Sequence, residues 1–258
     1  MTKILSVLLV CSALVLTFCK QTTDRKAENN GMPANATPIQ VQISHLNCWT
    51  EGGQFYVTGI CNSQSDQWQK IWLLMEALDS SGKTVSEGVV FPVFSASVPP
   101  RGRSAFFQGW PLADFSGVPD TCRVTGAGAV GQTAGPVLLV EGLSGVRMLA
   151  PGSPGGAAAA SSELGWQISA ELSNPLEQTA EHPRLELLLF GNDQRLWFAA
   201  LLNPEDDRLK EVLKMEGTGP LLPVSKRRFG VSVDYANLPE ALKTQKIGRV
   251  EMLAFEEK

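Results

Sequence analysis

The most reactive side chains in this sequence are those of its five cysteines, Cys11, Cys19, Cys48, Cys61 and Cys122. A thiolate can bind zinc, form a disulfide or carry a modification. Zinc sites usually contain closely spaced cysteine pairs or a cysteine beside histidines. The chain has no Cys-x-x-Cys pair, and the nearest histidine to any cysteine is His45, three residues before Cys48. We therefore expect no metal or other cofactor.

Acid–base catalysis would depend on two histidines, His45 and His182. A Ser-His-Asp hydrolase needs an imidazole that is held beside a nucleophile. His45 falls within an alternating strand pattern, His182 directly precedes Pro183, and no Gly-x-Ser-x-Gly motif is present. These features predict that the protein is not an enzyme.

Two clusters of charge could bind ions or partners. The acids at 205–207 lack the alternating oxygen ligands of a calcium loop and favour the start of a short helix instead. The basic cluster at 226–228 is predicted to be a solvated, protective edge, with an anionic partner as the alternative. Because the formal net charge is -4, we expect no nucleic acid partner.

Residues 1–19 have the pattern of an export signal, with Lys3 followed by an apolar run over 4–16. This run is shorter than the 20 or so residues of a transmembrane helix. The last four residues of the signal, ending at Cys19, resemble the lipobox of bacterial lipoproteins, with Phe18 where that motif has a small residue. The resemblance implies a lipid on Cys19, and a cleaved signal or a retained anchor helix is the alternative. Residues 20–37 are polar and predict a flexible stalk.

From residue 38 onward, short strand patterns alternate with turn signals, which predicts an all-β sandwich. The chain alternates apolar and polar residues before the glycine turn at 52–53, and a denser apolar run at 71–78 suits a central strand. The six strands expected in this half lie at 38–48, 55–61, 71–78, 85–94, 104–110 and 122–130.

The second half repeats this order with low residue identity. The matching segments are 137–143, 166–174, 185–190, 222–229 and 247–255. We therefore expect a tandem duplication, with one β-sandwich domain at 38–132 and a second at 136–258. The segment at 151–162 is rich in Pro, Gly and Ala and predicts a mobile loop within the second domain.

The order of strand, Asn, loop, dense strand and Asp-x-x-Gly-Lys turn resembles the FxLYD-type domains of bacterial envelope and secreted proteins, which are small Ig-like sandwiches. In the first half the resemblance is carried by Gly59, Asn62-Ser63, 75–79 with Gly82-Lys83, and 98–102 before Phe106. In the second half it is carried by Ser173-Asn174, 187–191, and Leu222-Pro223 before Phe229. It implies two tandem non-catalytic modules, and it brings no site residues.

The strand directions predict which cysteines pair. If successive strands are antiparallel, Cys48 ends the first strand and Cys122 begins the last at the same end of the sandwich, while Cys61 lies roughly 17–20 Å away. A disulfide requires Cα atoms within about 7 Å. A Cys48–Cys122 disulfide is therefore predicted, with Cys61 as a buried thiol. The alternative is the immunoglobulin-like Cys61–Cys122 bridge across Trp72, which would follow if 85–94 were a loop.

Together these features predict a lipid-anchored bacterial envelope protein, periplasmic or surface-exposed, that acts as a non-catalytic binding or scaffold module. We expect its partners to be the membrane, through the lipid, and a protein of the envelope. The alternative function is an envelope ligand-binding subunit or enzyme with a site in the groove between the domains. Such a groove would be lined by loops.

Overall fold

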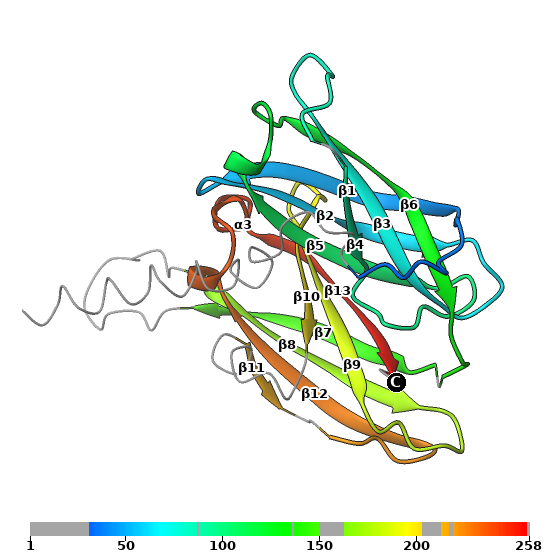
Figure 1. The fold of residues 1–258 in the computed structure, drawn as a ribbon. Coiled ribbons are helices and arrows are strands. Elements are labelled where there is room, and N and C mark those ends of the chain that lie inside the picture. The colour runs from blue at the N-terminus through cyan, green and yellow to red at the C-terminus, as the bar shows by residue number, and fades with distance from the viewer. Residues whose placement is uncertain are drawn as a thin grey trace, which may run out of the picture.

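The computed structural model describes residues 31–256 except 87, 136, 150–162, 203–212 and 217–218. These residues form antiparallel strands in four sheets (Figure 1), which confirms the predicted all-β sandwich class. The expected signal, Cys19, most of the stalk, the loop at 151–162 and the acids at 205–207 lie outside the described residues.

The first sandwich consists of two three-stranded sheets. The first sheet has the order β1 (Val41–Glu51), β2 (Gln54–Ser63), β5 (Arg103–Pro111). The second has the order β4 (Val89–Pro92), β3 (Gln69–Leu78), β6 (Thr121–Gly131). Alternate residues of these strands point inward, because successive side chains of a strand face opposite sides. The core between the sheets includes Phe55, Val57, Ile71, Leu73, Met75, Phe91 and Phe106.

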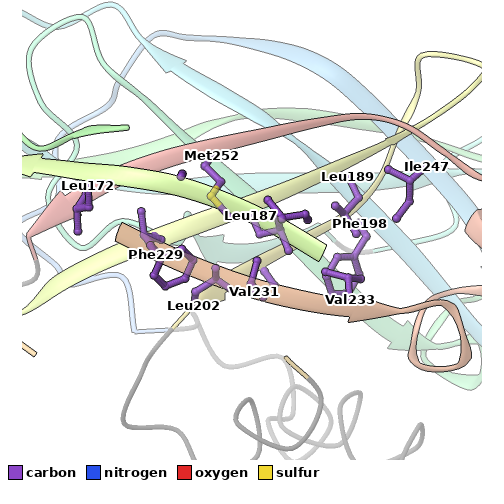
Figure 2. Close-up of a cluster of buried hydrophobic side chains, with 14 of the residues drawn as sticks. Leu172, Leu187, Leu189, Phe198, Leu202, Phe229, Val231, Val233, Ile247 and Met252 are labelled. Atoms are coloured by element: carbon purple, nitrogen blue, oxygen red, sulfur yellow. The ribbon is translucent and has the colours of Figure 1, made fainter. Parts of the chain in front are cut away.

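The second sandwich has a four-stranded and a three-stranded sheet. The larger sheet has the order β11 (Leu213–Glu216), β12 (Ser225–Asp234), β8 (Glu163–Asn174), β7 (Leu139–Leu149). The smaller has the order β10 (Leu196–Leu202), β9 (Pro183–Gly191), β13 (Ile247–Glu256). A short helix, α3 (Glu240–Gln245), precedes β13. Figure 2 shows the core between these sheets, with labelled side chains that include Leu172, Leu187, Leu189, Phe229, Val231 and Met252.

The two sandwiches have the same order of strands in their sheets. The order β1-β2-β5 in the first corresponds to β7-β8-β12 in the second, and β4-β3-β6 corresponds to β10-β9-β13. Strand β11 extends one sheet of the second sandwich only. This agreement is the arrangement that a tandem duplication would produce.

One strand differs from the sequence-based expectation, and the basic cluster agrees with it. The strand expected over 85–94 is reduced to the four residues of β4, which still pairs antiparallel with β3. The basic cluster at 226–228 lies at an edge of its sheet, as expected, because among the described residues it pairs only with β8, while β11 pairs with β12 over Gly230–Val233.

The sandwiches pack through strand faces. The outer face of the β1-β2-β5 sheet covers the outer face of the β10-β9-β13 sheet, so the molecule has four β layers (Figure 1). Strand β9 is consequently buried along its whole length. Its residues Leu187 and Leu189 point into the core of the second sandwich, while Leu188 and Phe190 face the first sandwich. We call this contact the seam, and it differs from the loop-lined groove considered above.

Candidate functional site

The centre of the seam is an apolar cluster from both sandwiches. Its buried members are Ile60 and Ala105 of the first sandwich and Leu188, Phe190, Leu196 and Ala199 of the second. Contacts between domains of one chain are usually fairly polar and permit relative motion. A buried apolar contact of this kind instead holds the two sandwiches together as a domain core would.

One charged side chain lies inside this apolar contact. Glu186 of β9 is fully buried, and its Oε1 accepts a hydrogen bond of 2.6 Å from the Ser104 hydroxyl. Its Oε2 accepts a second bond of 2.6 Å from the backbone N–H of Ala105. Burial raises the pKa of Glu186 to about 7, although these hydrogen bonds and the charge of Arg103 act in the opposite direction. The carboxyl group therefore joins β9 to β5 and titrates near neutral pH.

Aromatic rings close one end of the seam. Trp49 of β1 lies edge-on to Trp197 of β10, with ring centroids 5.1 Å apart, and Phe107 contacts Phe198 at 5.5 Å. Tyr56 stacks on Trp49 at 5.3 Å. Such ring pairs stabilise a contact beyond the area they bury.

Polar contacts accompany these rings. The buried Asn47 side chain donates a hydrogen bond of 3.0 Å to the backbone carbonyl of Leu196. Glu51 accepts a bond of 2.8 Å from the backbone N–H of Glu240, the first residue of α3. An acid at the start of a helix satisfies an otherwise free N–H group. Three alternate residues of β1, Asn47, Trp49 and Glu51, thus contact the second sandwich.

The two histidines are exposed and lie on different elements. His45 is exposed in a bulge of β1, where its ring meets Phe190 edge-on at 5.1 Å. The guanidinium of Arg249 covers the same Phe190 ring at 3.8 Å. His182 is exposed in the loop before β9. His45 therefore belongs to the packing at the rim of the seam.

The structure brings two of the three cysteines of the first sandwich together. Cys48 on β1 lies against the start of β6, where its Sγ is 3.9 Å from the Oγ1 of Thr121, the residue before Cys122. The hydrogen bond from Cys122 is the largest cause that lowers the pKa of Cys48, which falls to about 7 despite partial burial. Cys61 is buried apart from this pair, and burial raises its pKa to about 12.

The basic cluster makes internal ion pairs. Lys226 lies on the outer face of its sheet, 2.5 Å from Glu141 Oε2 and 3.1 Å from Glu171 Oε1. All three side chains are well exposed, so these pairs contribute little to stability. The described residues contain no group of three or more His, Cys, Asp or Glu side chains suited to a metal ion. In the same part of the chain, no helix has the length and apolar character needed to cross a membrane.

Sequence reasoning did not single out Glu186. The available signal was a lone acid in the apolar run at 185–190. The position is buried because β5 of the first sandwich covers this face of β9. Cys48, Cys61 and Cys122 carry free thiols in the structure, so the predicted Cys48–Cys122 disulfide stays a prediction.

Comparison with known proteins gives no family. No family model matches the chain, and no curated protein matches it. A red sea bream transglutaminase structure aligns with 86% of this chain and 27% of its own, at 14% identity and a TM-score of 0.22. The C-terminal globular domain of a Pyrococcus abyssi oligosaccharyltransferase aligns with 86% of this chain and 47% of its own, at 13% identity and a TM-score of 0.19.

A tandem CBM22 domain pair from Paenibacillus barcinonensis Xyn10C aligns with 90% of this chain and 92% of its own, at 9% identity and a TM-score of 0.18. The chain thus spans about a quarter and about half of the first two structures. TM-scores this low carry no argument about function.

Proposed function

We propose that the protein is a non-catalytic scaffold or binding module of the bacterial cell envelope, held at a membrane by a lipid on Cys19. Its two sandwiches act as one stiff unit that presents its outer strand faces to an envelope protein. The observation that carries this proposal is the seam, because its apolar centre, its aromatic end and the buried Glu186 join the sandwiches along a whole strand.

Separation of the sandwiches would be costly. A hinge motion would expose Leu188 and Phe190 to water and would break both hydrogen bonds of Glu186. Full burial of one such apolar side chain contributes about 1.5–3 kcal/mol. A unit of fixed shape loses little conformational entropy when it binds a partner, and this suits a scaffold.

The seam also bears on the alternative function. A ligand site between the domains would need a hollow with a few converging polar groups. Apolar and aromatic side chains occupy the contact, and Glu186 already has partners on β5. The arrangement therefore favours the scaffold over a ligand-binding subunit with an interdomain site.

Metabolic labelling with a palmitate analogue tests the anchor. We expect label and membrane retention in the wild type, loss of both in Cys19→Ala, and retention of both in the matched variant Cys11→Ala. Label that persists in Cys19→Ala would overturn the lipid attachment.

Small-angle X-ray scattering tests the stiff unit. We expect one radius of gyration, constant with ionic strength, for the chain from residue 31 onward. Leu188→Asp, which places a charge in the seam, should increase that radius. A wild-type chain that scatters as a flexible pair of beads would contradict the proposal, whatever its lipid state.

A further inference from the structure

Cys48 and Cys122 face one another across the open side of the first sandwich. Cys48 lies on β1, the edge strand of one sheet, and Cys122 is the second residue of β6, the edge strand of the other. The two strands lie against each other, Cys48 and Cys122 belong to the same core cluster, and Cys48 Sγ lies 3.9 Å from the hydroxyl of Thr121, the residue before Cys122. A bond between the sulfurs would tie β1 to β6 directly, on the side where the segment before β1 already pairs with β6 through Thr37 and Ala129.

Cys61 is too far along its strand to compete. Val57 of β2 is the neighbour of Cys48 in the sheet, and Cys61 lies four residues further along β2, opposite Ile43. At a rise of about 3.4 Å per residue this separation along the strand is about 14 Å. A disulfide requires Cα atoms within about 7 Å. A Cys48–Cys61 bridge is therefore excluded in this fold.

The two facing thiols differ in reactivity. Cys48 is half-buried, and hydrogen bonds from Cys122 and Thr121 stabilise its thiolate. Cys122 is buried, and its pKa is raised because its proton is held in the hydrogen bond to Cys48 and because burial disfavours its charged form. A partly exposed thiolate beside a protonated partner is the arrangement in which one sulfur attacks and the other resolves.

We propose that Cys48 and Cys122 form a redox site that closes to a disulfide by exchange with a small or protein disulfide. The Cys48 thiolate attacks one sulfur of the donor disulfide, the donor S–S bond breaks, and the second donor sulfur leaves as a thiolate. Cys122 then loses its proton and attacks Cys48 in the mixed disulfide, releasing the other donor sulfur. The donor takes up two electrons, its two thiolates take up two protons, and the protein gains one S–S bond.

This disulfide would hold β1, the strand that contacts the second sandwich through Asn47 and Trp49. Successive side chains of a strand face opposite sides, so Cys48 points toward β6 while its neighbours Asn47 and Trp49 point into the seam. Asn47 binds the carbonyl of Leu196, and Trp49 packs on Trp197. Oxidation at Cys48 thus fixes β1 between the core of its own sandwich and the seam.

Peptide mapping of the full chain after incubation with oxidised glutathione tests the site. No Lys or Arg lies between Cys48 and Cys61, so trypsin leaves both in one peptide, whereas cleavage after Glu51 separates them. We expect a linked Cys48–Cys122 peptide in the wild type and in Cys61→Ala. In Cys122→Ser the reaction should stop at a mixed disulfide between Cys48 and glutathione. Cys48→Ser should form neither this adduct nor a linked peptide.

Thermal unfolding supplies a second readout. Because the disulfide restricts the unfolded chain, oxidised wild type should melt about 5–15 °C above the reduced protein. Cys48→Ser should show no such shift. A Cys61–Cys122 peptide, or a wild-type protein that stops at the mixed disulfide or keeps its thiols free, would overturn the proposal. None of these outcomes depends on the lipid anchor or on an envelope partner.

Discussion

The carboxyl group of Glu186 accepts a hydrogen bond of 2.6 Å from the hydroxyl of Ser104 and so joins the second sandwich to the first. The same hydroxyl accepts a bond of 2.9 Å from the backbone N–H of Ser95. The carboxyl group is fully buried, and removal of its charge from water is costly even with good partners. Protonation of Glu186 therefore changes the stability of the seam.

We expect the free energy of unfolding to fall as the pH rises from about 4.5 to above 7. The pKa of Glu186 is raised from 4.5 to about 7 by burial, so the folded state binds the proton more tightly than the unfolded state. The stabilisation is complete below about pH 4.5 and is lost as the pH rises through about 7. A shift of this size corresponds to about 3 kcal/mol.

Urea unfolding at pH 5 and pH 8 measures this effect. Glu186→Gln should remove most of the difference between the two pH values, while Glu141→Gln, an exposed acid on the outer sheet face, should retain it. An identical pH dependence in wild type and Glu186→Gln would show that Glu186 titrates outside this range.

A substitution at Leu188 tests the contribution of the seam to stability separately from that of the two cores. Residues 136–258 should fold alone with a cooperative thermal transition, because the second sandwich has its own core. In the full chain Leu188 is buried in the seam, so Leu188→Thr should destabilise it by about 2–4 kcal/mol. In the fragment the same side chain faces water, and the change should be close to neutral. Equal costs in both proteins would argue against the seam.

The sequence patterns predicted the strands better than they predicted the contact between the sandwiches. The dense apolar run of β9 was assigned to a central strand, and the structure adds that both its faces are buried, one in the core and one in the seam. The seam partners Ile60 and Ala105 are ordinary residues of alternating strands, and nothing local marks them. Which sheet faces meet depends on how the two sandwiches dock. The alternation of apolar and polar residues along a single strand does not indicate this.

Local sequence also failed where packing set the limits of a strand. Thr84 reaches Leu78 only through an isolated bridge, and regular pairing with β3 begins at Val89, so the strand expected over 85–94 is short. Strand β4 still runs antiparallel to β3, so the strand direction on which the Cys48–Cys122 prediction depends is the expected one. The disulfide itself stays a prediction.

Gly59 tests how tightly the first core is packed. A Cβ atom at this position would lie 2.5 Å from the Phe106 ring, which is buried in the core. Because close-packed cores do not yield easily, Gly59→Ala should destabilise the protein by about 1–3 kcal/mol in urea unfolding. The matched variant Gly131→Ala, where no atom lies within 4 Å of the added Cβ, should change stability by less than about 0.5 kcal/mol. A neutral Gly59→Ala would mean that Phe106 can move freely.

Asn62 and Asn174 occupy matching positions at the ends of β2 and β8, yet they make different contacts. The Asn174 amide donates to the backbone carbonyls of Gln178, Leu221 and Leu222 at 2.7, 3.2 and 3.2 Å, and the residue is almost fully buried. The half-buried Asn62 amide contacts the carbonyl of Gln42 and the hydroxyl of Ser44, both at 2.9 Å.

Loss of the amide should therefore cost more in the second sandwich than in the first. Asn174→Ala removes the hydrogen bonds of an almost fully buried amide, while the carbonyls of Leu221 and Leu222 keep donors in the N–H of Ala180 and the hydroxyl of Ser225, so we expect a loss of about 1–3 kcal/mol. Water can replace the amide of Asn62, and Asn62→Ala should cost about 1 kcal/mol or less. Asn174→Asp, which has a similar shape but no donor, should be at least as damaging as Asn174→Ala, because it sets a charge against carbonyl oxygens. Urea unfolding of the three variants would contradict this assignment if Asn62→Ala were the most destabilising.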